Sequence, residues 1–343
     1  MAAPYDRALR DAIAGATAAV PGIELQRAVD ALSRRYRDGA AGAGAVGRLT
    51  DAERLAYAVV RLPATAAALD AVFDAVARHT RVEPQTITDL GAGPGTVLWP
   101  ALSRWPAIRR VTLLDRDPDL LRLGVQLWKA AASGPGARPG LDVQLRTGDL
   151  AAGDAPAADL VVLSYAIGEL TEARAGQALE RALALTSGAL VVVEPGTPAG
   201  FARIRVVRDR LRASGATIAA PCPHDEACPM AGADWCHFAV RLDRSRAHRQ
   251  SKHAALGWED EKFAYVVAVR DAALLRARAE ARVIRRPRKE TGHVRLALCA
   301  AGGLTDVVVT RRAPTYRAAR DASWGDAWAA TSGATAELDP SNG

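Results

Sequence analysis

The sequence has few cysteines, few lysines and no long hydrophobic segment. Its 343 residues include four Cys, and only four of its 45 cationic residues are Lys. No stretch reaches the roughly 18 uncharged apolar residues that a membrane helix requires, which argues against a membrane protein. The first 20 residues carry Asp6 and Asp11 and lack the apolar run of a secretory signal. We therefore expect a cytoplasmic protein whose cysteines are thiols or metal ligands rather than disulfides.

The charge of the chain is unevenly distributed. Hydrophobic residues make up 49% and charged residues 24%, the composition of a globular protein with a substantial core. Residues 201–320 contain 24 Lys and Arg against 12 Asp and Glu, whereas the remainder contains 21 against 26. A compositional preference for Arg explains why the cations are Arg, but not why they gather in one segment. The asymmetry indicates a polyanion-binding region attached to a near-neutral body.

Four regions follow one another along the chain. Residues 1–80 show helical spacing of apolar residues, with Thr65 as a candidate helix cap after Pro63. In residues 81–213 short apolar runs alternate with helical stretches, which predicts a parallel, Rossmann-like α/β sheet. Residues 214–328 predict a basic, mostly β appendage whose first strands could still complete the core sheet. The tail, 329–343, is predicted to be disordered.

The expected core elements are short. The predicted strands are Thr86–Leu90, Val111–Asp115, Asp142–Arg146, Leu160–Ser164 and Ala189–Glu194. The predicted helices cover 96–104, 118–132, 171–186 and 199–213. In the appendage, strands are expected at Phe263–Arg270, Ala281–Arg286, His293–Cys299 and Asp306–Arg311.

A glycine-rich loop follows the first expected strand. It has the order D-x-G-x-G-x-G, formed by Asp89, Gly91, Gly93 and Gly95. Glycine lets the backbone turn sharply and come close to a ligand. The next strand ends in Asp115, where a carboxylate can accept hydrogen bonds from both hydroxyls of a ribose. Asp149 and Ser164 follow the third and fourth strands, so we expect all these residues at the carboxyl edge of the sheet.

This pattern resembles the class I S-adenosylmethionine-dependent methyltransferases. The resemblance implies that the glycines pass under the amino-acid end of the cofactor, that Asp115 holds the ribose and that Asp149 faces the adenine, with Asp89 and Ser164 in the same site. A dinucleotide-binding Rossmann domain would show G-x-G-x-x-G. Here the third glycine comes one residue too early and Pro94 fills the gap, which favours the methyltransferase interpretation.

No catalytic residue can be assigned. Residues 165–169 follow the fourth strand, where amino-methylating enzymes often carry an Asn/Asp-Pro-Pro-aromatic motif, and that motif is absent. No cysteine lies there either, so a cysteine nucleophile has no candidate on this loop. Glu169 is open to two interpretations, a base or a helix-capping, solvated acid.

All four cysteines fall in the second half of the chain. They are Cys222, Cys228, Cys236 and Cys299, with the spacing C-x5-C-x7-C-x62-C. Four thiolates are the full ligand set for a tetrahedral zinc ion or a four-iron cluster. The C-x2–4-C knuckle usual in zinc sites is missing, and proline follows two of the cysteines, as it follows the fourth cysteine of bacterial ferredoxins. The spacing leaves an iron–sulfur cluster and zinc as alternatives.

The segments around these cysteines resemble the methyltransferase-like family of small-ribosomal-subunit assembly proteins, found in bacteria and mitochondria. The likeness runs from about residue 86 to 328 and is carried by 221–230, 234–238, 260–265, 286–299 and 316–326, together with 164–170 and 193–198. It implies S-adenosylmethionine as one cofactor and a 4Fe-4S cluster held by the four cysteines as the other. It also implies that small-subunit ribosomal RNA is the partner during ribosome assembly.

The cations of the appendage form a candidate RNA-binding surface. Arg is suited to phosphate because its planar fork donates two hydrogen bonds. The candidates are Arg244, Arg249, Lys252, Arg285, Arg286, Arg288 and Lys289. We expect a protein that is monomeric off the ribosome, binds ribosomal RNA and assists assembly of the small subunit. The alternative is an active S-adenosylmethionine-dependent rRNA methyltransferase.

Overall fold

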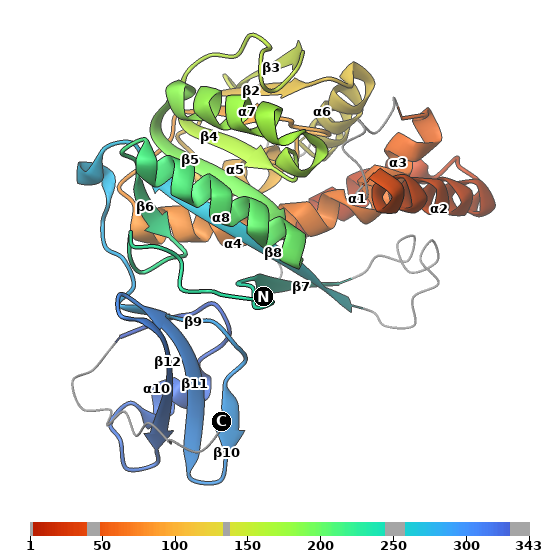
Figure 1. The fold of residues 1–343 in the computed structure, drawn as a ribbon. Coiled ribbons are helices and arrows are strands. Elements are labelled where there is room, and N and C mark those ends of the chain that lie inside the picture. The colour runs from red at the N-terminus through yellow and green to blue at the C-terminus, as the bar shows by residue number, and fades with distance from the viewer. Residues whose placement is uncertain (1–2, 40–48, 133–137, 244–257, 330–343) are drawn as a thin grey trace.

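A computed structural model describes residues 3–39, 49–132, 138–243 and 258–329. Its largest element is an eight-stranded sheet in the order β3-β2-β1-β4-β5-β8-β6, with β7 paired to β8 (Figure 1). The strands are β1 (Thr86–Leu90), β2 (Arg110–Asp115), β3 (Asp142–Thr147), β4 (Ala158–Ser164), β5 (Thr186–Pro195), β6 (Thr217–Ala220), β7 (Phe238–Asp243) and β8 (Trp258–Val269). The first five are parallel, and β8 runs antiparallel to β5, β6 and β7.

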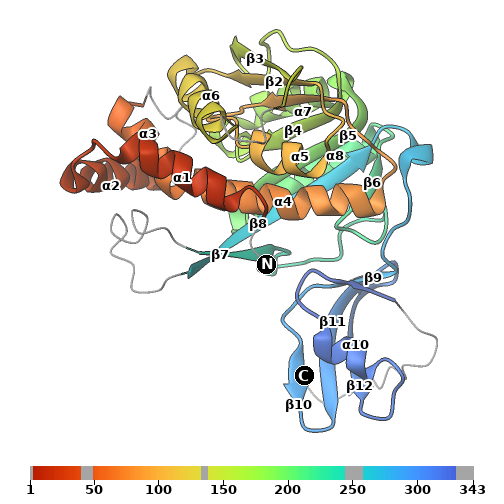
Figure 2. The same cartoon turned by 180° about the vertical axis from the view of Figure 1, so that it is seen from behind.

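Helices cover both faces of this sheet. Figure 1 shows α7 (Glu172–Leu185) and α8 (Pro198–Ala213) on one face. Figure 2 shows α4 (Leu62–His79), α5 (Leu98–Arg104) and α6 (Pro118–Ala132) on the other. Successive residues of β5 alternate between the two layers: Val191 packs with the α4 side, and Leu190 and Val192 pack with the α8 side. This period of two explains why the central strands are apolar along their whole length.

The N-terminal helices pack on the edge of the sheet beside α6. They are α1 (Asp6–Thr17), α2 (Gly22–Gly39) and α3 (Asp51–Val60), and they share a separate apolar cluster with α6 and the start of α4. A capping box at Thr50 and Glu53 begins α3. Among the described residues no single helix is both long and apolar enough to cross a membrane, and α3 with α4 passes that test only as a pair bent by 45°.

The expected cap at Thr65 is wrong. Helix α4 already begins at Leu62, with Pro63 in its first turn, and the Thr65 hydroxyl lies inside the helix and donates to the Arg61 carbonyl. Proline lacks an N–H and has a helical φ, so it fits the first turn of a helix rather than interrupting one.

A second, smaller sheet follows β8. It has the order β10-β11-β9-β13, with β12 on the other side of β11, and lies below the large sheet in Figure 1. Its elements are β9 (Ala281–Val283), β10 (Arg288–Glu290), β11 (His293–Ala300), β12 (Gly303–Thr310), α10 (Tyr316–Asp321) and β13 (Ala327–Trp328). It has its own core, which includes Val283, Leu296 and Trp328.

The appendage is therefore shorter than residues 214–328. The structure places β6, β7 and β8 in the large sheet, and a separate sheet starts only with β9. The alternation of strands and helices stops after α8 because β8 is antiparallel, and an antiparallel strand needs no crossover helix. Of the expected disordered tail, 329–343, all residues after 329 lie outside the described part of the chain.

Helix α6 packs directly on the glycine loop through Gly124. A Cβ added to Gly124 would lie 1.8 Å from the Pro94 carbonyl oxygen. We expect Gly124→Ala to lower the free energy of unfolding by about 1–3 kcal/mol, because a backbone atom cannot move aside as a side chain can. Urea denaturation measures this change in the free energy of unfolding. Gly15→Ala in α1 is the matched control: its Cβ meets nothing within 4 Å, so it should stabilise by up to about 1 kcal/mol. Equal effects of the two substitutions would contradict this account.

Candidate functional site

The glycine loop borders a cavity of about 470 Å³ at the carboxyl edge of the sheet. Gly91 and Gly93 line it, and both have left-handed φ angles, +79° and +53°. A Cβ on Gly91 would lie 2.7 Å from the Ala166 Cβ, whereas one on Gly93 would have no atom nearer than 3.8 Å. Gly95 is also left-handed and packs on Leu113, away from the cavity lining. The loop thus presents bare backbone to the cavity.

Asp115 lies where β2 ends and lines the same cavity. Its Oδ2 accepts a hydrogen bond from the Gly93 N–H at 2.8 Å, and its Oδ1 accepts one from the Asp117 N–H at 2.9 Å. Burial raises the pKa of Asp115 from its ordinary value. The carboxylate is therefore fixed in orientation, and each oxygen keeps a second lone pair for a ligand.

Asp89 lies behind the loop rather than in the cavity wall. It is fully buried, and neither of its carboxylate oxygens has a hydrogen-bond partner in the described part of the chain. Burial, with the nearby charge of Asp115, raises the pKa of Asp89 to about 8. A buried carboxyl without a partner is costly when ionised, so the site favours a cationic group nearby.

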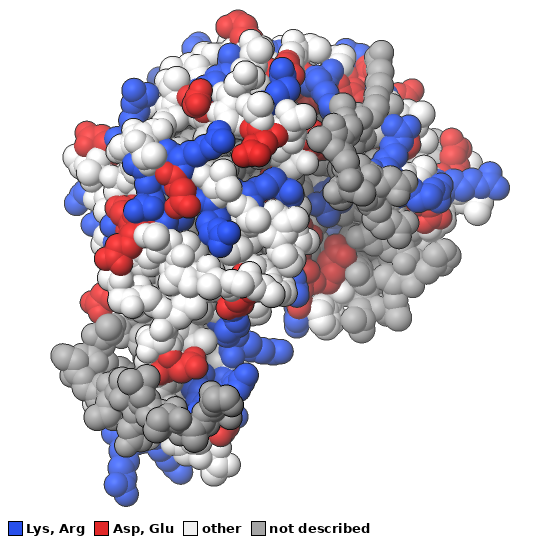
Figure 3. Space-filling model, in the orientation of Figure 1, with Lys and Arg blue, Asp and Glu red and all other residues white. Residues whose placement is uncertain are grey.

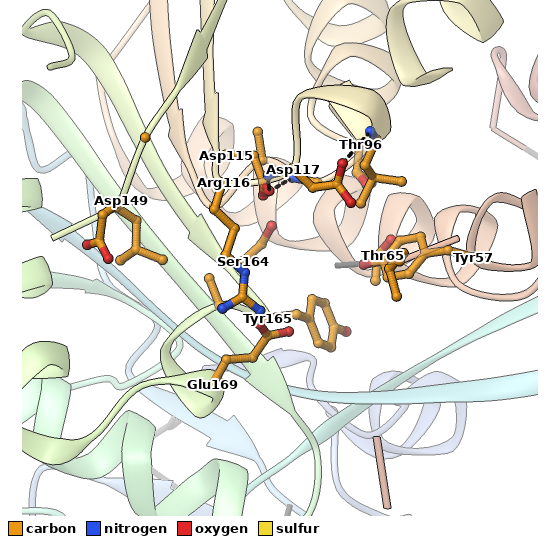
Figure 4. Close-up of a pocket in the computed structure, with 18 of the residues that line it drawn as sticks. Tyr57, Thr65, Thr96, Asp115, Arg116, Asp117, Asp149, Ser164, Tyr165 and Glu169 are labelled. Carbon is orange, nitrogen blue, oxygen red and sulfur yellow. Dashed lines mark hydrogen bonds and ion pairs between the residues drawn. The ribbon is translucent and has the colours of Figure 1, made fainter. Parts of the chain in front are cut away.

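Two N-terminal helices, α3 and α4, form one wall of the cavity. Tyr57 and Thr65 line it opposite Asp149 (Figure 4). The buried Arg54 holds α3 in place: its Nε donates to Asp117 at 3.1 Å, and its other nitrogens pair with Asp51 and Asp119. The sequence analysis missed this wall because its residues are more than 20 positions before the glycine loop.

The segment after β4 forms another part of the wall. Ser164 lines the cavity as expected, and the following Tyr165 has a φ of +56°, which is rare for a residue with a Cβ. The Tyr165 hydroxyl donates to Glu261 on β8 at 3.2 Å, and Arg61 lies over the ring. Strained residues gather at functional sites when their surroundings hold them in place.

Two polar side chains meet between the ends of β2 and β4. Arg116 and Glu169 form an ion pair at 3.0 Å, visible at the centre of Figure 4. Burial raises the pKa of Glu169. Glu169 is not the cap of α7, because Thr171 occupies that N-cap position. The Glu169 carboxylate is paired with Arg116 instead. Asp149 also lines the cavity, but its half-exposed carboxylate accepts from the Ala151 N–H and pairs with Arg174.

All four cysteines line one further cavity. It lies between α8, β8 and the small sheet, and its walls include Cys222, Cys228, Cys236 and Cys299. All four are free thiols and partly buried. Burial raises the pKa of Cys222 and Cys236, and that of Cys299 to about 12. Within the described part of the chain, no three His, Cys, Asp or Glu side chains are grouped so that they could hold a single metal ion.

Two histidines also lie near this cavity. His224 is buried in its wall, with its Nε2 3.7 Å from the Cys299 Sγ. His237 is buried between Trp235 and Trp324, with ring centroids 5.3 and 4.3 Å away.

The candidate RNA-binding cations separate into different environments. Arg286, Arg288 and Lys289 are exposed around β10, and Figure 3 shows cationic side chains at the lower end of the small-sheet region. Arg285 is half-buried and paired with Asp234. Arg244, Arg249 and Lys252 lie outside the described residues.

The sheet order and the first cavity together define a class of protein. Five parallel strands, an antiparallel strand inserted before the last, a glycine loop after β1 and an acid at the end of β2 form the class I methyltransferase fold. The model of the family described as "Mitochondrial small ribosomal subunit Rsm22" matches residues 51–329. The chain belongs to this family.

Curated relatives are similar over most of the chain. The human "Ribosome assembly protein METTL17, mitochondrial" is 30% identical over 302 residues, which covers 81% of this chain and 62% of the relative. The "Rsm22-cox11 tandem protein 2, mitochondrial" of Schizosaccharomyces pombe is 26% identical over 333 residues, covering 81% of this chain and 43% of the relative. The chain thus spans less than two thirds of either relative.

Solved structures are similar to part of the chain at a lower level. Magnesium protoporphyrin IX methyltransferase from Synechocystis PCC 6803, with bound SAH, has a TM-score of 0.39 at 14% identity, covering 60% of this chain and 82% of that one. The pyocyanin biosynthetic protein PhzM has a TM-score of 0.39 at 20% identity, covering 65% and 60%. Similarity at this level identifies no ligand for this chain.

The raised pKa of Asp89 predicts a pH dependence of stability. Between about pH 4 and 8 the folded, ligand-free protein holds a proton on Asp89 that the unfolded chain releases, so this group lowers stability as the pH rises. Asp89→Asn removes the effect. The stability of the variant relative to wild type should therefore increase from pH 5 to 8, by up to about 1.4 kcal/mol per pH unit.

Urea denaturation without ligand at both pH values measures this difference. Asp154→Asn is the matched control, since the Asp154 side chain is 87% exposed. Asp89→Asn and wild-type stabilities that change in parallel with pH would refute the prediction.

Proposed function

We propose that this protein binds S-adenosylmethionine and an iron–sulfur cluster, contacts small-subunit ribosomal RNA and assists assembly of the small ribosomal subunit. The family match over residues 51–329 carries the assembly role, and the human relative is named a ribosome assembly protein. The residues of the two cavities support the cofactors, and those of the small sheet support the RNA.

The first cavity suits S-adenosylmethionine by its chemistry. The Gly91–Gly95 loop leaves backbone room for the amino-acid end, and Asp115 offers free lone pairs to ribose hydroxyls. The ligand carries an ammonium and a sulfonium charge, and the buried, unpartnered Asp89 is the anionic group near the loop that such charges would stabilise. Ser164 and Asp149 complete the walls.

Asp115→Asn should weaken S-adenosylmethionine binding about 10- to 100-fold, because hydrogen bonds to a charged acceptor are worth about 1.5–3 kcal/mol. Isothermal titration calorimetry measures the change, with Asp154→Asn as the control that should bind like wild type. Wild-type affinity in Asp115→Asn would remove Asp115 from the proposed site. Transfer of a labelled methyl group from the cofactor to small-subunit rRNA would favour the alternative, an active methyltransferase.

The second cavity brings together the four thiols that a four-iron cluster requires. Four thiolates would also suffice for zinc, but the C-x2–4-C knuckle usual in zinc sites is missing from the sequence, which favours the cluster. When bound, a cluster would join the large sheet, through Cys222, Cys228 and Cys236, to Cys299 on β11.

Anaerobically purified protein should contain about four irons and four sulfides per chain and absorb visible light. Cys236→Ser should lose most of that iron, while Met230→Leu, a similar-sized change in the same cavity wall, should keep it. Iron and sulfide analysis with absorption spectroscopy decides the matter. A colourless protein with one zinc and no iron would overturn the cluster.

The small sheet suits RNA by its exposed cations. Arg286, Arg288 and Lys289 lie around one short edge strand, and Arg288 is paired in register with the exposed Arg295 on β11, which Glu290 compensates only in part through an ion pair at 3.5 Å. Cations held next to each other on a sheet repel one another. A phosphate backbone would relieve this repulsion, and the fork of Arg matches phosphate geometry.

Changing Arg286, Arg288 and Lys289 together to Gln should weaken rRNA binding and lower the slope of log K against log salt by about 2, at roughly 0.7–0.9 per lost phosphate contact. A salt titration with a small-subunit rRNA fragment measures the slope. The control removes the same charge from the exposed Arg78, Arg109 and Arg122. Equal losses in the two triple variants would show that only net charge matters.

The compartment and the oligomeric state remain predictions. We propose a monomer off the ribosome. A cytoplasmic location is expected from the sequence, whereas the human and yeast relatives are named as mitochondrial proteins.

A further inference from the structure

Three buried arginines in the described part of the chain have very different surroundings. Arg54, Arg208 and Arg282 are 5%, 3% and 6% exposed. Arg54 lies against three carboxylates, those of Asp51, Asp117 and Asp119. The other two arginines line the cysteine cavity, where carboxylates are scarce.

Arg208 reaches the cavity from α8. Its Nη2 donates to the carbonyls of His224 and Glu226, at 3.0 and 2.6 Å, on the loop between Cys222 and Cys228. Its one carboxylate neighbour among the described residues is Asp209, at 3.4 Å, whose side chain is 53% exposed. The same residues offer no hydrogen-bond partner to the buried Nε of Arg208.

Arg282 reaches the cavity from the opposite side, from β9 of the small sheet. Its Nε donates to the Pro221 carbonyl at 2.9 Å, and its Nη1 donates to the Gly325 carbonyl at 3.0 Å. Its Nη2 lies 3.4 Å from His79 Nε2. No carboxylate of the described residues lies within ion-pair distance of its guanidinium.

Two buried cations without sufficient carboxylates need an anion, because an uncompensated charge is expensive to bury. Neutral thiols do not provide one. Four thiolates on a four-iron, four-sulfide core of charge +2 carry a net charge of −2, which matches two guanidinium groups.

We propose that Arg208 and Arg282 are positioning residues that compensate the charge of the cluster in this cavity, hold the Cys222–Cys228 loop on it, and so set its reduction potential. This inference rests on the cluster proposed above. One-electron reduction takes the cluster from −2 to −3 without breaking a bond, so nearby positive charge stabilises the reduced form.

The test is the midpoint potential of the cluster in anaerobically purified, full-length protein, measured by titration with dithionite and redox mediators. Arg208→Met and Arg282→Met should each lower the equilibrium constant for reduction about tenfold, which corresponds to about 59 mV for one electron. Arg208→Lys and Arg282→Lys keep the charge and should retain most of the wild-type potential. Arg205→Met is the matched control, because Arg205 lines the same cavity from α8 but is exposed.

The outcomes separate this inference from the cluster itself. Wild-type protein without iron would overturn both. Loaded Met variants with the wild-type potential would overturn the inference alone. If the Met variants fail to hold iron, the Lys variants decide: iron retained in the Lys variants supports charge compensation, and iron lost equally from both kinds of variant overturns it.

Discussion

The pairing of β8 with three other strands is the constraint on which both cavities depend. The apolar second half of β8 lies between β5 and β6, and the first half of β8 pairs with β7. The loop that carries three cysteines starts after Ala220, which pairs with Val267, and ends before Phe238, which pairs with Phe263. Both ends of this loop are thus fixed on one strand. Glu261 of the same strand reaches Tyr165 in the first cavity.

The core of the fold could be predicted because its signals are local. Alternating apolar runs and helices place β1 and α6 at the observed bounds and the other core elements within a few residues. The Asp89–Gly95 loop and Asp115 are likewise found from their spacing, since each directly follows or ends a strand. Burial on both faces makes such strands continuously apolar, which is a strong signal.

What the sequence analysis missed depends on contacts between distant segments. Tyr57 reaches the first cavity, and Arg54 pairs with Asp117 of its wall, from a helix whose own pattern says only that it is amphipathic. The strain at Tyr165 has no signal, because a φ of +56° on a tyrosine goes against its preference. Arg282 belongs to a run of cations in the sequence, yet it is buried on β9, whereas Arg286 lies beyond the end of that strand and is exposed. A charge count cannot tell those two apart.

The two-ended attachment of the cysteine loop also orders the steps by which the second cavity forms. Pairing within the large sheet brings Cys222, Cys228 and Cys236 together from a stretch of 15 residues. Cys299 is 63 positions beyond Cys236 and reaches them on β11 of the other sheet. Closing the short loop costs less chain entropy than bringing in the distant strand. The large sheet by itself therefore forms an open, three-thiol half of the cavity, and docking of the small sheet supplies both the last thiol and the guanidinium of Arg282.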